Sequence, residues 1–128
     1  MSGKGKVLLM DDEQIILDVT GEILIFLKYE VMTAKDGQTA VDLYKKEKAA
    51  GSPFDVVILD LSVPNGLGGK ETIELLRSVD PEVKAVVSSG YTNDPVVQDF
   101  SRYGFCERLT KPYNIQAMKN LLENIIKK

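Results

Sequence analysis

The sequence has no histidine and only one cysteine among its 128 residues. Without an imidazole, the chain cannot supply the usual base of a hydrolase triad, a common zinc ligand or a histidine that carries phosphate. Because Cys106 is alone, no disulfide can form within the chain, which suits a reducing compartment. No apolar run approaches the length of a membrane span, and residues 1–6 lack the apolar core of a signal peptide. We therefore expect a cytoplasmic location and no membrane partner.

The chain also lacks a large excess of charge of either sign. Its formal net charge is −3, so we expect no direct nucleic-acid binding by this domain. Apolar residues make up 44% of the chain and charged residues 27%, which is ordinary for a globular protein. This length suits one domain with one core. We expect residues 1–5 to be a flexible N-terminus or a cloning remnant, and residues 6–128 to form the domain.

Hydrophobic periodicity predicts strands and helices in alternation. The predicted strands are residues 6–10, 30–34, 54–59, 83–87 and 105–110. The predicted helices are residues 13–28, a segment that carries Ala40, Val41 and Tyr44, residues 72–78, a segment that begins at Pro95 and ends at Gly104, and residues 115–126. This alternation implies right-handed crossovers and a parallel sheet with helices on both faces. The predicted fold class is α/β: a doubly wound five-stranded parallel sheet of the flavodoxin type, with strand order 2-1-3-4-5 and five helices.

Reactive side chains follow four of the predicted strands. They are Asp11, Asp12, Asp60, Ser88, Ser89 and Lys111. Each has an ordinary explanation when taken singly, because acids occur in solvated loops, serines form turns and lysines lie on surfaces. The carboxyl ends of parallel strands, however, meet at one edge of a sheet. The sequence therefore predicts that carboxylates, a hydroxyl and an ammonium gather at this edge.

Three carboxylates at one edge predict a bound cation. Like charges about 5 Å apart repel by roughly 3 kcal/mol per pair at an effective dielectric of about 20. Oxygen ligands without histidine or thiolate favour Mg²⁺ over zinc, and no calcium-binding loop is visible in the sequence. Opposite the acids, Lys111 could balance charge and bind a transferred phosphoryl group, and a serine hydroxyl could donate a hydrogen bond to that group.

Four segments resemble those of a known family when they are taken together. VLLMDDE, VVILDLSVPNGLGG, VVSSGY and LTKPY occur in this order, and from residue 6 to residue 128 the chain resembles the receiver domain of two-component response regulators. The resemblance implies a phosphorelay in which a sensor histidine kinase or phosphotransfer protein passes a phosphoryl group to an aspartate. It implies a signalling switch that catalyses its own phosphorylation and dephosphorylation, rather than a metabolic enzyme, and an output partner that the sequence does not identify.

The resemblance also implies how the acids are used. Asp60 matches the aspartate that accepts the phosphoryl group. Asp11 and Asp12 match the Mg²⁺ ligands, and Asp12 is expected to bind the ion more directly. Asp60 itself and the main-chain carbonyl of Ser62 complete the metal ligands that the resemblance implies.

Further residues bear on the phosphoryl contact and the switch. Lys111 matches the lysine that contacts the phosphoryl group, and Ser89 matches the switch hydroxyl, with Ser88 as the alternative. Arg108 stands where the family commonly has tyrosine or phenylalanine. An arginine cannot bury its charged head as an aromatic ring does. We therefore expect this chain to depart from the family's usual coupling between the rotamer of the aromatic side chain and the switch. Tyr91 is bulky enough to hinder the attacking water, which predicts slow dephosphorylation.

The sequence leaves three alternatives to the receiver function. A Mg²⁺-dependent phosphohydrolase with an aspartyl nucleophile is the main alternative, but such enzymes generally carry a second aspartate where this chain has Ser62. A flavin-binding domain would need a loop rich in hydroxyl groups and glycine after the first strand, and that loop here is acidic. A degenerate receiver that only binds proteins would not need the complete set of acceptor residues.

Overall fold

The computed structural model describes residues 5–64, 66–90, 93–111 and 113–126, and the structural statements below concern these residues. The strands are β1 (Gly5–Met10), β2 (Tyr29–Ala34), β3 (Val56–Asp60), β4 (Ala85–Ser89) and β5 (Glu107–Thr110). All neighbouring strands are parallel, in the order β2-β1-β3-β4-β5. The predicted doubly wound α/β fold is therefore confirmed.

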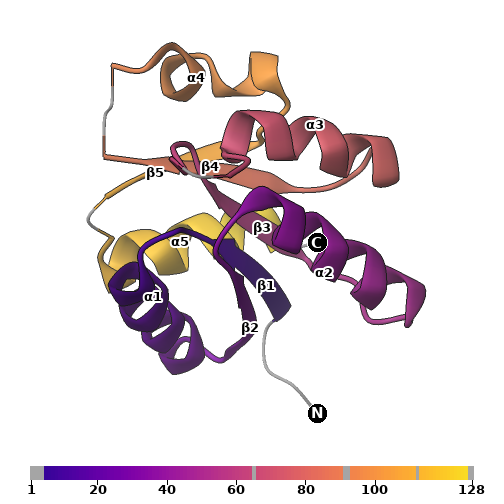
Figure 1. Cartoon of the computed structure of the whole chain (residues 1–128). Coiled ribbons are helices and arrows are strands. Elements are labelled where there is room, and N and C mark those ends of the chain that lie inside the picture. The colour runs from indigo at the N-terminus through magenta and orange to yellow at the C-terminus, as the bar shows by residue number, and fades with distance from the viewer. Residues whose placement is uncertain (1–4, 65, 91–92, 112, 127–128) are drawn as a thin grey trace.

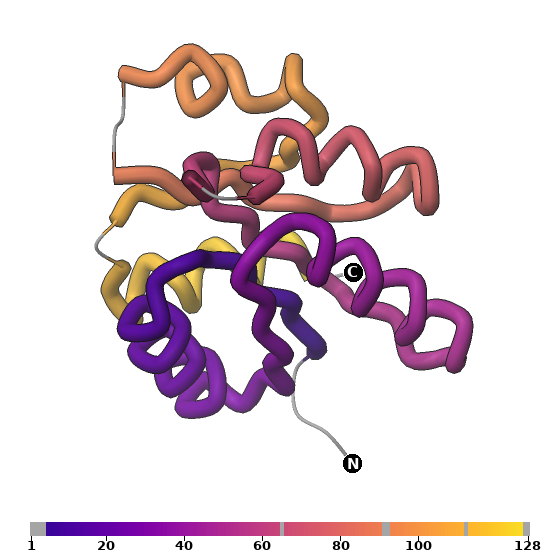
Figure 2. Tube along the Cα trace, viewed as in Figure 1, coloured from indigo at the N-terminus to yellow at the C-terminus, as the bar shows by residue number. Residues whose placement is uncertain are grey.

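Helices cover both faces of the sheet (Figure 1). They are α1 (Gln14–Phe26), α2 (Gly37–Ala49), α3 (Gly69–Val79), α4 (Pro95–Gln98), the 3₁₀ helix η1 (Phe100–Tyr103) and α5 (Ile115–Ile126). Helices α1 and α5 pack on one face, while α2, α3 and α4 lie on the other. Figure 2 follows the chain from β1 outward to β2, back past β1 to β3, and then through β4 to β5. Strand order thus reverses between β1 and β3, where such sheets place their ligand sites.

Residues 7–10 of β1 and 56–59 of β3 are apolar because both faces of these central strands are covered. In β1, Leu8 and Met10 join the core beneath α2 and α3, whereas Val7 and Leu9 join the core beneath α1 and α5. Strand β3 alternates in the same way, and every residue in it is buried. Such burial fixes the register of the two central strands and hence the position of their ends.

Most element boundaries differ from the sequence prediction by one to three residues. Strand β1 begins at Gly5, which pairs with Tyr29. Strand β4 runs from Ala85 to Ser89, about two residues later than predicted, because the amide of Val83 is held in a turn by the carbonyl of Asp80. As a result, Ser88 and Ser89 are the last two residues of the strand instead of following it.

The helix predicted from Pro95 is divided into two short parts. Asp94 caps the first part by accepting a hydrogen bond from the amide of Val96 at 2.9 Å. After Gln98 the chain tightens into η1 and ends at Gly104, whose φ of 101° suits glycine and agrees with its predicted place at the helix end. No helix among the described residues is both long and apolar enough to span a membrane.

Candidate functional site

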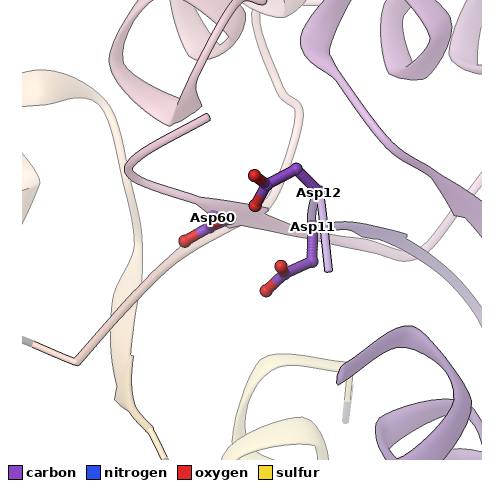
Figure 3. A group of neighbouring side chains, drawn as sticks. All are labelled: Asp11, Asp12 and Asp60. Carbon is purple, nitrogen blue, oxygen red and sulfur yellow. The ribbon is translucent and has the colours of Figure 1, made fainter. Parts of the chain in front are cut away.

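Three carboxylates meet at the carboxyl edge of the sheet. Asp11 and Asp12 follow β1 directly, and Asp60 is the last residue of the neighbouring strand β3. Figure 3 shows the three side chains pointing to the same side of the sheet edge. One carboxylate oxygen from each residue lies within 4.8 Å of the others. The convergence predicted from the strand ends is therefore present in the structure.

Burial makes this cluster electrostatically costly. Asp11 is 1% exposed and Asp60 is 4% exposed, whereas Asp12 is open to solvent. Burial raises the pKa of Asp60 to about 6, and the negative charge of Asp11 adds to the rise. Lys111 and the backbone amide of Ser62 act in the opposite direction without cancelling it. Without a further cation, the folded protein thus holds more negative charge here than it can balance.

Lys111 is the ammonium group that faces the acids. Its Nζ lies 2.7 Å from Oδ2 of Asp11 and 3.2 Å from Oδ1 of Asp60. Burial alone would lower the pKa of Lys111, but its contacts with Asp11 and Asp60 outweigh burial and raise it above the usual value. The lysine therefore stays charged and offsets part of the charge on three carboxylates.

Asp11 supplies an observation that bears on metal binding. Its Oδ1 accepts a hydrogen bond from the amide of Glu13 at 3.0 Å. Its Oδ2 is buried and, apart from the ion pair with Lys111, has no hydrogen-bond donor among the described residues. A buried carboxylate oxygen that contacts a single ammonium group, beside two further carboxylates, fits a small divalent cation that binds oxygen ligands. The cluster of Asp11, Asp12 and Asp60 therefore fits Mg²⁺.

An open cleft of about 200 Å³ gives access to this cluster. Its lining residues are Asp12, Glu13, Asp60, Ser62, Pro64, Ser89, Gly90 and Lys111. The structure thus brings the predicted Asp12, Asp60, Ser62, Ser89 and Lys111 to one cleft, while Asp11 lies buried beside it. Glu13 and Gly90 also line the cleft, although the sequence analysis assigned neither of them to the site.

The loop after β3 is folded tightly against the end of the strand. A Cβ atom at Gly68 would lie 2.5 Å from the carbonyl oxygen of Leu61, so only glycine fits there without a shift of the backbone. Within the loop, the amide of Gly66 donates to the carbonyl of Val63 at 3.3 Å. This close return keeps Ser62 at the rim of the cleft beside Asp60.

The two serines of β4 have different surroundings. Successive strand residues point to opposite faces. Ser89 lines the cleft, whereas Ser88 is fully buried and forms a hydrogen bond with the hydroxyl of Tyr113. The structure therefore favours Ser89 over Ser88 as the hydroxyl of the cleft. The bond between Ser88 and Tyr113 could not be predicted from the sequence, because nothing in the local pattern pairs two residues 25 positions apart.

Arg108 lies away from the cleft. It is exposed on β5, and its Nη1 donates to the carbonyl of Val97 at 3.4 Å. The centre of its guanidinium group lies 5.9 Å from the ring of Phe100, a distance typical of a cation–π contact. Arg108 thus links β5 to α4 and η1 through its charged head, as expected for a residue that cannot bury it. Tyr91 lies outside the described residues, and its effect on dephosphorylation stays a prediction.

The sequence also matches known proteins. It matches the response regulator receiver domain family over residues 7–123. The two-component response regulator ARR10 of Arabidopsis thaliana is 28% identical over 123 residues, which is 96% of this chain and 21% of the relative. Sporulation initiation phosphotransferase F of Bacillus subtilis is 23% identical over 121 residues, which is 94% of this chain and 93% of the relative. The chain therefore spans about a fifth of the plant regulator and nearly all of the bacterial protein.

Solved structures with the same fold include other receiver domains. One is the receiver domain of a sensor histidine kinase from Pseudomonas aeruginosa, with a magnesium ion in its active site cleft (TM-score 0.84, 20% identity, 97% of this chain and 98% of the other). Another is a receiver domain from Clostridium thermocellum (TM-score 0.83, 26% identity, 95% and 94%). The comparisons do not favour the phosphohydrolase alternative. With the predicted acids gathered at the edge where strand order reverses, the chain belongs to the response regulator receiver domain family and is a receiver domain of two-component signalling.

Proposed function

We propose that Asp60 accepts a phosphoryl group from a phosphohistidine of a sensor histidine kinase or phosphotransfer protein. The observation that carries this proposal is the place of Asp60 at the end of β3, where it lines the cleft between Asp12 and Lys111. A carboxylate so placed can act as a nucleophile towards an incoming phosphoryl group. The domain proposed to do this comprises residues 6–128.

The transfer is a displacement at phosphorus. A carboxylate oxygen of Asp60 forms a bond to phosphorus while the bond from phosphorus to the histidine nitrogen breaks, and that nitrogen keeps the electron pair. Lys111 is proposed to contact the phosphoryl oxygens, since its Nζ already lies 3.2 Å from Oδ1 of Asp60. Ser89, which also lines the cleft, is proposed to donate a hydrogen bond to the same group. Attack by water on phosphorus would then break the bond to the Asp60 oxygen, release inorganic phosphate and restore the carboxylate, so the domain would catalyse its own dephosphorylation.

The proposed metal ligands are Asp11, Asp12, Asp60 and the carbonyl of Ser62. Their support is the shared carboxylate cluster and the buried Oδ2 of Asp11, which is paired with Lys111 and lies beside two further carboxylates. Bound Mg²⁺ would offset negative charge on the transferring phosphoryl group.

We also propose where the phosphodonor protein rests. An apolar groove of about 220 Å³ lies beside the cleft, and Lys111 lines both. On α1, Ile15 is 69% exposed and Val19 is 54% exposed along this groove. A protein that brings a phosphohistidine to Asp60 has to cover the cleft, and the adjoining apolar surface would gain from burial under it. We further propose a cytoplasmic location, where the lone Cys106 would stay reduced.

Phosphorylation by a small phosphodonor tests the acceptor directly. Wild-type protein, Asp60→Asn and the surface control Asp42→Asn are incubated with acetyl phosphate and Mg²⁺, and intact mass and peptide mapping follow the product. We expect one phosphoryl group on Asp60 in wild type and in Asp42→Asn, and none in Asp60→Asn. Equal modification of Asp60→Asn, or a wild type that stays unmodified, would overturn the proposal.

A further inference from the structure

A partly buried hydrogen bond joins the segment just before α5 to the end of β4, behind the cleft. The partners are the hydroxyl of Tyr113 and Oγ of Ser88, and Ser88 is fully buried. Burial raises the pKa of Tyr113 to about 12, so the hydroxyl stays protonated at neutral pH and can donate or accept. The proposed chemistry at Asp60 gives neither hydroxyl a task.

Ser88, one partner in this bond, lies directly beside Asp60. Ser88 pairs with Asp60 in the register of β3 and β4, and its carbonyl accepts a hydrogen bond from the amide of Leu61 at 2.9 Å. The main chain of Ser88 is thus fixed beside the proposed acceptor, and its side chain holds Tyr113. The bond to Ser88 therefore connects Tyr113 to the strand end that carries Asp60.

The same bond anchors the segment that carries Lys111. The amide of Lys111 donates to the carbonyl of Ser89 at 2.9 Å, and two residues later Tyr113 bonds to Ser88. Two hydrogen bonds therefore connect the segment of Lys111 to the last two residues of β4: one is made by Lys111 itself and the other by Tyr113. Its long side chain has to place Nζ near both Asp11 and Asp60, and a shift of its backbone would change both distances. Loss of the bond between Tyr113 and Ser88 therefore removes one restraint on that backbone.

We propose that Tyr113 is a positioning residue, which holds the segment of Lys111 against Ser88 and thereby speeds phosphoryl transfer to Asp60. The inference rests on the proposed functions of Asp60 and Lys111. The competing explanation is a hydrogen bond that only stabilises the fold, because buried hydroxyls generally find partners. The two explanations differ in whether the effect of the hydroxyl depends on Lys111.

The experiment measures the rate of Asp60 phosphorylation by acetyl phosphate in the full chain, at saturating Mg²⁺. Tyr113→Phe removes only the hydroxyl, and we expect the rate to fall by about threefold to tenfold, the range of a small loss of positioning. Ser88→Ala removes the other partner and should slow the reaction to a similar degree. The double variant should be no slower than either single variant, because one bond is lost in all three.

Two further arms separate positioning from simple stabilisation. In a Lys111→Ala background, measured at raised donor concentration, Tyr113→Phe should cause no further loss of rate. Tyr44→Phe is the matched control, since it removes a buried tyrosine hydroxyl that donates to Asp80 at the far edge of the sheet, and it should leave the rate unchanged.

The outcomes are distinguishable from those of the proposed function. If wild type is phosphorylated on Asp60 and Tyr113→Phe and Ser88→Ala react at the wild-type rate, the positioning role is wrong while the acceptor stands. A loss of rate that persists without Lys111, or that also appears in Tyr44→Phe, would likewise overturn it in favour of a structural role. A wild type that is never modified would overturn the acceptor and the inference together.

Discussion

The amino edge of the sheet, where the strands begin, and the carboxyl edge, where they end, each contain a partly or fully buried lysine. The two lysines differ in how their charge is balanced. At the amino edge, Lys6 is 7% exposed and donates to Glu47, to the carbonyl of Ser52 at 2.8 Å and to Oγ of the same serine at 3.0 Å. At the carboxyl edge, Lys111 faces Asp11 and Asp60 with Asp12 nearby. The amino edge is balanced by its own residues, whereas the carboxyl edge has an excess of negative charge.

A second contrast concerns one aspartate at each edge. The hydroxyl of Tyr44 donates to Asp80 at 2.8 Å and, as the largest cause, holds the pKa of Asp80 below its usual value. At the other edge, burial and Asp11 raise the pKa of Asp60. A carboxylate whose charged form the fold stabilises is typical of a structural interaction. A carboxylate whose charged form the fold destabilises is typical of a functional site. The amino edge is expected to supply stability and the carboxyl edge reactivity.

The largest effect on stability is expected at the amino edge. Glu47→Ala leaves the buried ammonium of Lys6 without its carboxylate, and breaking such a pair typically costs about 3 kcal/mol of unfolding free energy. Urea unfolding measures this loss, and Asp42→Ala on the exposed face of α2 is the control. The rate of Asp60 phosphorylation should not change. A loss below about 1 kcal/mol, within the range of an exposed pair, would show that this edge is not the structural one.

Removal of an acid at the carboxyl edge is expected to act in the opposite direction. In metal-free buffer at pH 7, Asp60→Asn removes a buried charge and its repulsion from Asp11 but loses attraction to Lys111, and we expect a net gain of about 1 to 2 kcal/mol. Mg²⁺ should stabilise wild type and narrow the difference. Thermal and urea unfolding with and without Mg²⁺ give the measurement.

The stability difference between Asp60→Asn and wild type should depend on pH. Because the pKa of Asp60 in the folded protein, about 6, is above its usual value, the folded state binds the proton more tightly than the unfolded chain. The stability contributed by this group is present at low pH and is lost as pH rises through about 6. The advantage of metal-free Asp60→Asn over wild type should therefore shrink between pH 7 and pH 5. An advantage that stays constant over this range would mean that Asp60 is not the crowded group.

The sequence predicted the fold because its signals are local. Each central strand is a continuous apolar run, and the stripes of α1 and α5 recur at helical spacing. The cluster of Asp11, Asp12 and Asp60 followed from two strand ends that the fold class makes neighbours. The end of β4 was misplaced because a turn at Asp80 and Val83 delays the strand, and a backbone hydrogen bond of this kind leaves no mark on apolar periodicity.

The pairs that tie the elements together could not be predicted in this way. Tyr113 bonds to Ser88 across 25 residues, and Tyr44 bonds to Asp80 across 36 residues. Such pairs depend on how the helices pack on the sheet, and the same residue types occur at many other positions of the chain. The roles of Ser62, Ser89 and Tyr91 stay predictions, because they depend on a phosphoryl group or a metal ion.

The smallest effect is expected from the hydroxyl of Tyr44. Tyr44→Phe removes the hydrogen bond to Asp80 and should lower the unfolding free energy at pH 7 by about 1 kcal/mol, as for one hydrogen bond. Because this bond holds the pKa of Asp80 below its usual value, its stabilisation is present at neutral pH and is lost as Asp80 becomes protonated. The difference between wild type and Tyr44→Phe should therefore disappear in strong acid, whereas that between wild type and Asp60→Asn should disappear nearer pH 5. Urea unfolding across this range compares the two variants, and if both differences vanished at the same pH, the two edges would not differ in how they hold their carboxylates.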